Sequence, residues 1–167
     1  FLLLPILAHA AVREPKTGAV TFQATASPGA LAIRGNGTAP TGKLELQESA
    51  DKVEVTGSLK LNVESFKTGI SLRDNHMKEK FLETGKFPEA LLLLTKQVLP
   101  KKGQGAFEGD LVLHGVKHKV SGLGEILTAG DGTRTVKASF PVKLTDHGIP
   151  IPTFAGISVA DQVSVET

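Results

Sequence analysis

The chain has 167 residues, contains no cysteine, and carries 19 basic against 17 acidic residues. Its length suits a single domain with a sizeable core, and the lack of cysteine excludes disulfides and thiolate chemistry. The charges are balanced and interleaved, which excludes a nucleic-acid footprint in bulk. Phenylalanine occurs eight times but tryptophan and tyrosine are missing, and this scarcity of stacking platforms argues against a single-strand binder.

The first ten residues, FLLLPILAHA, are uncharged and apolar and end in the small-x-small pattern Ala8-His9-Ala10. They are too few to span a bilayer and suit the end of a secretory signal peptide, with cleavage after Ala10. We therefore expect residues 1–10 to be a signal-peptide remnant and residues 11–167 to be one exported domain without a membrane span. The alternative is a buried first strand.

Most of the remaining chain alternates apolar and polar residues, which is typical of strands with one buried face. Turn sequences separate these runs, among them Ser27-Pro28-Gly29, Gly35-Asn36-Gly37 and Gly130-Asp131-Gly132. The spacing predicts an all-β fold of eight or nine antiparallel strands. Their length favours an extended eight-stranded barrel, whose closure would leave no exposed edge. The alternating runs cover residues 20–26, 43–47, 53–66, 107–113, 135–145 and 157–166.

A barrel of this size has room for one small ligand when its inward side chains do not fill it. Several positions expected to point inward are small, which suggests a chain-shaped void, although small residues also accompany strand coiling. These positions are Ala24, Ala26, Gly57, Gly109 and Ala138.

A short helix is predicted over residues 72–83. Leu72 and His76 are four residues apart, as are Met77 and Phe81, so they form one mostly apolar stripe. Ser71 is the expected N-cap. Residues 90–99, ALLLLTKQVL, are apolar on both faces at their start, and a strand of that kind needs a cover on its outer side. We expect the helix either to supply that cover or to cap the barrel.

No nucleophile elbow, phosphate loop or zinc-protease helix occurs in the sequence. A metal site built from His76, from His114 or His118, and from His147 is geometrically conceivable, because ligands can come from distant strands. His114 and His118, however, flank a predicted hairpin turn, where local hydrogen bonding is the ordinary role. Asp74 lies near Arg73 and His76, but nothing in the sequence pairs carboxylates for acid–base work.

Three segments resemble the YceI-like family. In SFKTGISLRDNHMKEKFLETGKFPEA the matching residues are Ser65, Thr68, Gly69, Arg73, Asp74, His76, Met77, Phe81, Leu82, Phe87 and Pro88. In FEGDLVLHGVKHKV they are Gly109, Leu111, His114, Gly115, Val116 and Val120. In LTDHGIPIPTFAGISVADQVSVE they are Asp146, Gly148, Ile149, Val159, Asp161 and Val163. The first motif is specific, and the other two support it.

The resemblance implies an extended lipocalin-like barrel in the periplasm that binds a polyisoprenoid lipid in an apolar channel, often as a homodimer. For this chain we expect a carrier that sequesters an isoprenoid-type lipid, either a polyprenyl or a quinone-like chain. We expect neither an enzyme nor a cofactor other than the lipid. The residues expected to contact the head group or line the channel are Arg73, His76, Phe22, Phe81, Phe107 and Phe140.

Two alternatives remain open at this point. One is an envelope enzyme in which Arg73, Asp74 and His76 act on a bound lipid or quinone. The other is a metal-associated envelope protein that uses its histidines. The structural interpretation of the same three residues is that they brace the helix on the barrel.

Overall fold

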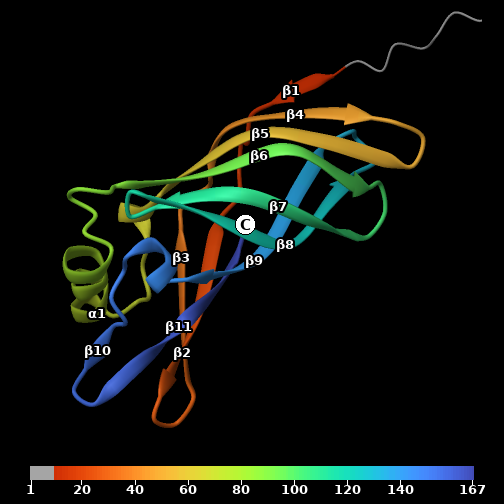
Figure 1. The fold of residues 1–167 in the computed structure, drawn as a ribbon. Helices are drawn as coiled ribbons and strands as arrows, with labels where there is room; N and C mark the ends of the chain where they lie inside the picture. The colour runs from red at the N-terminus through yellow and green to blue at the C-terminus, as the bar shows by residue number, and fades with distance from the viewer. Residues whose placement is uncertain (1–9) are drawn as a thin grey trace, which may run out of the picture.

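The computed structural model describes residues 10–167, which form one curled antiparallel sheet with a short helical segment across one end (Figure 1). The predicted signal-peptide remnant therefore lies outside the described residues except for Ala10. The strands are β1 (Ala11–Arg13), β2 (Val20–Ser27), β3 (Leu31–Gly37), β4 (Thr41–Glu48), β5 (Lys52–Asn62), β6 (Glu89–Pro100), β7 (Gln104–Leu113), β8 (Val116–Thr128), β9 (Arg134–Lys143), β10 (Thr153–Phe154) and β11 (Ile157–Glu166). The helical elements are η1 (Val63–Ser65), α1 (Ser71–His76), η2 (Met77–Phe81) and η3 (Thr145–His147).

The all-β, antiparallel, lipocalin-like fold is confirmed, but the sheet has eleven strands in place of eight and does not close. Its order is β1-β4-β5-β6-β7-β8-β9-β11-β2-β3, with β10 paired to β11. The path ends at β1 and β3, so the predicted closure is wrong. The chain leaves β3 at Thr38, whose amide donates to the Ser65 hydroxyl at 3.0 Å. The outer edge of β3 is instead paired at one point, where Asn36 and Lys67 exchange backbone hydrogen bonds of 2.9 Å.

β3 runs straight through Gly35-Asn36-Gly37, which we predicted to be a turn. The glycine is needed there for close packing, because a Cβ on Gly35 would overlap the Phe22 ring and approach the Lys67 carbonyl oxygen to 2.7 Å. Glycine in a strand often marks such a close approach. The true hairpin turn lies earlier, between β2 and β3.

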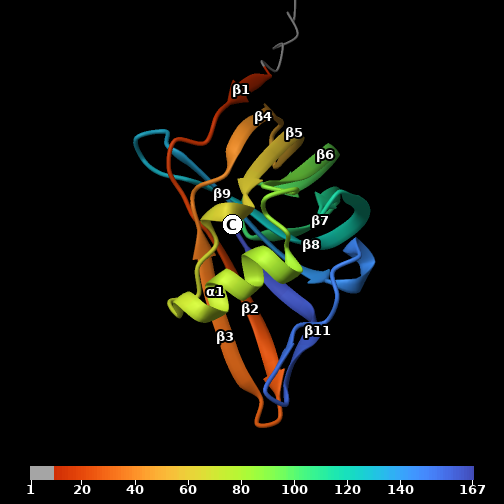
Figure 2. The same cartoon turned by 90° about the vertical axis from the view of Figure 1, so that its left-hand side faces the viewer.

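The helical segment is found where it was predicted: α1 and η2 together run from Ser71 to Phe81. Ser71 is not the N-cap, because Ile70 occupies that position and offers no side-chain hydrogen bond. Figure 2 shows the segment lying across the open end of the curled sheet. It therefore caps the open end of the curled sheet and does not cover the outer side of β6. No helix in residues 10–167 is long and apolar enough to cross a membrane.

The core divides the molecule into two halves. In the half formed by β4, β5, β6 and β8, the inward side chains fill the interior. Leu99 of β6, for example, would lie 3.1 Å from a Cβ on Gly124 of β8. The other half, formed by β2, β3, β9, β11, the helical segment and the adjoining ends of β5, β6 and β7, encloses a cavity. The side chains that fill the first half are Leu44, Leu46, Val53, Val55, Leu99 and Ile126.

Candidate functional site

A cavity of about 440 Å³ lies next to the helical segment. Its walls come from β2, β3, β9, β10, β11 and the helical segment, from the ends of β5, β6 and β7 nearest that segment, and from the loop before β10. Every lining side chain is apolar except those of Thr68, Arg73, His76, Lys80 and Thr153. A largely apolar cleft of a few hundred Å³ with a few polar groups is the usual form of a small-molecule site.

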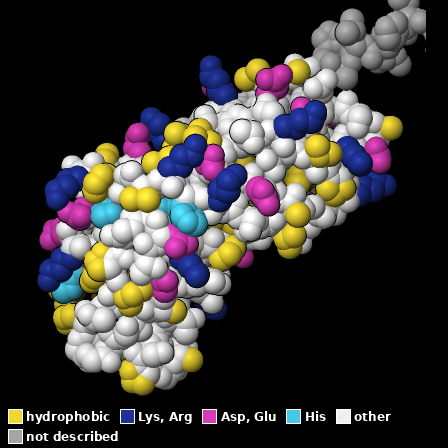
Figure 3. Space-filling model, in the orientation of Figure 1, with side chains coloured by type: hydrophobic (Ala, Val, Ile, Leu, Met, Phe, Trp, Pro, Cys, Tyr) yellow, Lys and Arg dark blue, Asp and Glu magenta, His cyan; other side chains and the backbone are white. Residues whose placement is uncertain are grey.

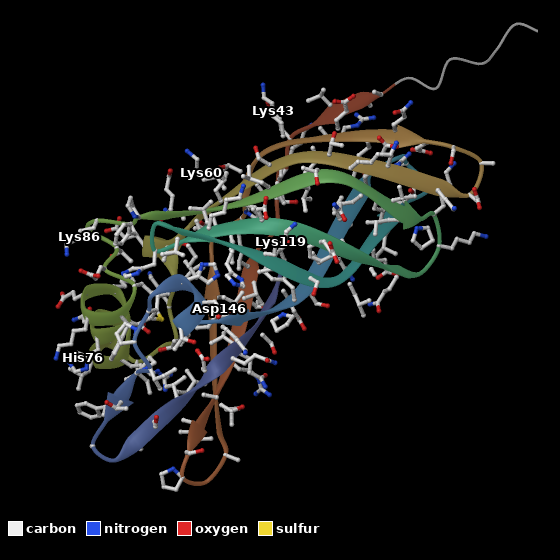
Figure 4. All side chains as sticks on the ribbon, viewed as in Figure 1. Lys43, Lys60, His76, Lys86, Lys119 and Asp146 are labelled. Carbon is white, nitrogen blue, oxygen red and sulfur yellow. The ribbon has the colours of Figure 1, made fainter. Side chains whose placement is uncertain are left out.

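The cavity opens to solvent beside the helical segment. Five large apolar lining side chains are exposed there, and we call this opening the mouth. Phe154 of β10 also contacts the helical segment, because its ring lies 5.6 Å from that of His76. Figure 4 shows His76 at the edge of the helical segment that faces β10. The mouth residues are Leu31, Ile70, Leu72, Phe154 and Ile157.

The inner side of the cavity is formed by Phe140, which is buried. The ring of Phe107 packs edge-on against it, with centroids 5.8 Å apart and an interplanar angle of 88°. Phe107 does not line the cavity and lies beside Leu99 in the packed half. The pair therefore separates the cavity from the filled core.

Five of the six residues expected to contact a ligand line the cavity. Phe22, Phe81 and Phe140 belong to its apolar wall, and Arg73 and His76 to its polar part. The sixth residue, Phe107, lies behind the wall.

The small residues turn out to have two different roles. Ala24 lines the cavity and leaves space in it. Gly57 and Gly109 do not, because a Cβ on Gly57 would overlap the Lys43 carbonyl and one on Gly109 would come within 3.0 Å of the Leu93 carbonyl. Ala26 and Ala138 also lie outside the lining. Only Ala24 therefore fits the predicted role in forming a void.

The polar lining residues on the helical segment share one face. Arg73, His76 and Lys80 are three and four residues apart, which places them in one row along a helix. No aspartate or glutamate is among the lining residues of the described chain. The mouth therefore offers hydrogen-bond donors and positive charge to whatever occupies it.

Asp74 belongs to a brace and does not line the cavity. Its carboxylate accepts hydrogen bonds from the Thr68 amide at 2.7 Å and from the Thr68 hydroxyl. Arg73 Nε donates to the same hydroxyl at 2.7 Å, and Arg73 Nη2 donates to the Thr68 carbonyl at 3.1 Å. These bonds tie the start of α1 to the loop that precedes it, which supports the bracing interpretation.

The brace also determines the ionisation of Asp74. Burial alone would raise the pKa of this carboxyl. The hydrogen bonds from Thr68 and Gly69, together with the charge of Arg73, outweigh that effect and lower the pKa below its ordinary value. A carboxylate held in this state is an acceptor, and its position does not suit proton transfer within the cavity.

A second brace holds the end of the helical segment. His114 Nε2 lies 2.9 Å from the Glu83 carboxylate, and His114 Nδ1 lies 3.3 Å from the His147 carbonyl oxygen. His147 is fully buried and its Nδ1 donates to the Val116 carbonyl at 3.0 Å. The pKa of Glu83 is lowered, first by the hydrogen bond from Lys86 and then by that from His114.

These contacts show what the histidines do. His114 and His147 hydrogen-bond to backbone or carboxylate groups, while His76 packs against Phe154 at the mouth. Residues 10–167 contain no group of three His, Cys, Asp or Glu side chains arranged to hold a metal ion. The geometry therefore gives the metal-associated alternative no site to build on in this part of the chain.

Several lining residues were missed at the sequence level. Lys80 was not singled out, although it lies four residues from His76. Phe154 was missed because its segment has no clear alternation, and Ile157 was placed in the alternating run 157–166 without being assigned to the cavity. The sequence did offer one signal for this segment. The run from Gly148 to Ala160 contains only apolar or neutral residues, and residues near both of its ends match the family.

Comparison with known proteins agrees with this architecture. A solved structure of BcnA from Burkholderia cenocepacia is similar with a TM-score of 0.71 and 15% identity, covering 88% of this chain and 92% of that one. A polyisoprenoid binding domain from Saccharophagus degradans, implicated in plant cell wall breakdown, gives a TM-score of 0.65 and 16% identity over 95% of both chains. The YCEI protein of Campylobacter jejuni gives 0.53 and 19%, over 81% of this chain and 84% of that one.

At these identities the structural likenesses show the fold. No curated protein is significantly similar to the chain in sequence. The family model of the YceI-like domain, in contrast, matches residues 12–167, which is nearly all of the described chain. The chain belongs to the YceI-like domain family.

Proposed function

We propose that this protein binds the chain of an isoprenoid-type lipid in its cavity and carries it through the bacterial periplasm. The observation that supports the proposal is the apolar cavity of about 440 Å³, with its polar residues confined to the helical segment and nearby loops. The similar structure from Saccharophagus degradans is described as a polyisoprenoid binding domain.

The apolar wall supplies the affinity in this account. Phe22 and Phe66 pack at a centroid distance of 5.2 Å on one side, and Val163 and Val165 of β11 also line the cavity. Burying a hydrocarbon chain between them yields about 0.8 kcal/mol per methylene group, less the cost of ordering the chain. Because this driving force is not directional, it favours chain-like apolar ligands without specifying one.

The polar residues set the orientation of the ligand. Arg73, His76 and Lys80 face the cavity near its mouth, so the head group would stay there while the tail extends toward Phe140. A quinone carbonyl or a phosphate would both accept hydrogen bonds from these side chains. The same arrangement makes binding the preferred role over catalysis, because Asp74 is already occupied by Thr68.

Export is proposed from the sequence of residues 1–10, together with the lack of cysteine. Fractionation of cells that express the full-length gene with a C-terminal tag tests it. Recovery in the periplasmic fraction supports the proposal, and recovery with the cytoplasm contradicts it. Light scattering on the same preparation tests the homodimer that the family resemblance implies.

The lipid itself is tested by solvent extraction of the purified protein followed by mass spectrometry. We expect a prenyl lipid at close to one per chain, or uptake of an added prenyl lipid by delipidated protein. Ala24→Phe fills the cavity and should reduce uptake by about tenfold or more. Thr25→Phe, one residue along β2 on the exposed side, is the matched control and should bind normally. An empty protein that takes up neither prenyl nor fatty acyl chains would contradict the proposal.

A further inference from the structure

Two neighbouring hairpins form an uncharged projection at the cavity end of the molecule. Residues 24–33 and 148–160 contain no aspartate, glutamate, lysine, arginine or histidine, whereas 22% of the whole chain is charged. We call these residues the tip. The two parts lie side by side because Ser158 pairs with Ser27 and Val159 with Ala26 in the sheet. Figures 1 and 2 show both hairpins extending in the same direction beyond the sheet.

The tip exposes large apolar side chains. Leu31 is 55% exposed, Phe154 59% and Ile157 41%. In Figure 3 the lower end of the molecule is mostly neutral surface with a few hydrophobic side chains, and it shows no acidic or basic side chain on the visible face. Several large apolar side chains exposed at one uncharged end of a molecule indicate an interaction surface.

Basic residues outnumber acidic ones on the side of the tip that faces the helical segment, whereas Asp146 and Asp161 flank residues 148–160 on the other side. The adjoining segments, residues 34–38 and 65–82, carry five basic side chains and two acidic ones, whereas the whole chain has 19 basic and 17 acidic residues. One of the two acids, Asp74, already accepts hydrogen bonds from Thr68. The basic residues are Arg34, Lys67, Arg73, Lys78 and Lys80.

We propose that the tip is a docking surface for a bilayer that contains anionic phospholipids. Exposed apolar side chains flanked by lysine and arginine are the features by which proteins bind at the membrane interface without crossing it. Basic residues near such a surface add electrostatic attraction. A second copy of this chain fits less well, because two tips meeting would bring two net positive surroundings together.

The mouth of the cavity lies partly within the tip, so docking would bring the cavity opening to the membrane. Leu31, Phe154 and Ile157 line the cavity as well as being exposed at the tip. A docked tip would therefore place the cavity opening against the bilayer, and a lipid chain could move between the two without being exposed to water. This last step rests on the proposed lipid binding, whereas docking itself does not.

The test is flotation of delipidated protein with phosphatidylcholine vesicles, prepared with and without phosphatidylglycerol, at low and high salt. We expect at least about tenfold stronger partition into the anionic vesicles at low salt, and a decrease as salt screens the basic residues. Absence of partition into either kind of vesicle would overturn the proposal.

Variants at the hairpin turns separate docking from lipid binding. Ala30 and Ala155 are exposed, do not line the cavity, and have φ values of 51° and 49°. Asp and Asn adopt this left-handed conformation more readily than Ala, so the substitutions should not harm folding. Ala30→Asp with Ala155→Asp places two negative charges in the tip and should reduce partition by about tenfold. The corresponding Asn pair should retain most of it.

Ala50→Asp is the control at the opposite end, in the turn between β4 and β5, and should behave like the unmodified protein. Equal partition of the Asp pair and the Asn pair would overturn the proposal. A shift from dimer to monomer in the Asp pair, without any vesicle binding, would assign the tip to a second copy and overturn it as well. Vesicle binding by a protein that takes up no lipid supports docking and counts against the proposed role of the cavity. Lipid uptake by a protein that binds no vesicles supports the role of the cavity and overturns docking.

Discussion

The two halves of the curled sheet are built from the same alternating sequence pattern but have different interiors. Around β4 and β5 the inward side chains, such as Val53 and Val55, are completely buried against one another. Around β2 and β11 some inward side chains, such as Phe22 and Val163, are only half-buried where they face the cavity, although others, such as Val20, are buried. Alternation therefore determines which face points inward, while the distance between facing walls decides whether the interior is filled.

Glycines account for part of this difference. Gly42 of β4 and Gly57 of β5 sit where a Cβ would overlap a carbonyl of the paired strand, so these two strands approach closely and coil. Across the sheet, Leu99 packs directly onto Gly124. On the cavity side, Ala24 leaves space that no neighbouring side chain fills. The same class of small residue thus tightens one half and opens the other.

The largest expected effect comes from truncating one phenylalanine in each half. Phe107→Ala removes a buried ring that packs against Phe140 and should lower the free energy of unfolding by about 3–5 kcal/mol. Phe22→Ala removes a ring that already faces open space and should cost about 1–2 kcal/mol. Chemical denaturation of both variants measures the difference. Equal losses would mean that the two halves are packed alike.

A smaller effect is expected from the brace at the start of α1. Asp74→Asn weakens the hydrogen bonds from Thr68 and should cost about 1–2 kcal/mol near neutral pH. It should also speed the release of bound lipid, because the start of the helical segment is no longer tied to the preceding loop. Asp161→Asn is the matched control, since Asp161 accepts the same pair of bonds from Thr145 at 2.9 and 2.7 Å. It should lose stability without faster release.

The Asp74 brace also predicts a pH dependence. The pKa of Asp74 is lower in the folded protein than its ordinary value of 3.8. Its stabilising contribution is therefore complete above that value and is lost as the pH falls through the folded-state pKa. Melting curves of the native protein and of Asp74→Asn should converge as the pH is lowered below 3.8. A constant difference down to the most acidic pH would contradict this sign.

The smallest effect is expected at the other brace. Glu83→Gln weakens the ion pair with Lys86 and the bond to His114, both near the surface, so the loss of stability should be small. Local opening is the more sensitive measurement, and hydrogen exchange should accelerate in residues 77–82. Glu89→Gln disrupts the exposed pair with Lys60 and should leave those amides unchanged. Unchanged exchange in Glu83→Gln would show that this brace does not hold the helical segment.

Much of the fold could be predicted from the sequence. Alternation located most of the strands, and the stripe of Leu72, His76, Met77 and Phe81 located the helical segment to within two residues at its C-terminal end. The strand count and the open sheet could not be predicted, because they depend on pairings such as Asn36 with Lys67 that leave no periodic signal. Gly35-Asn36-Gly37 looked like a turn because the space taken by the Phe22 ring is a tertiary feature.

The site was predictable only in part for a related reason. Phe107 and Phe140 both occupy inward positions of alternating strands, yet only Phe140 reaches the cavity. Which ring lies in front depends on how far the sheet has curled at that point. Phe154, an exposed residue of the mouth, belongs to a short strand without periodicity.

The central claim is that the half of the sheet that encloses the cavity binds the lipid. A crystal structure of the protein loaded with a prenyl lipid tests it most directly. We predict tail density between Phe22 and Val163 that reaches Phe140, with the head group beside Arg73 and His76. A cavity that remains empty while the lipid lies elsewhere on the surface would contradict the account.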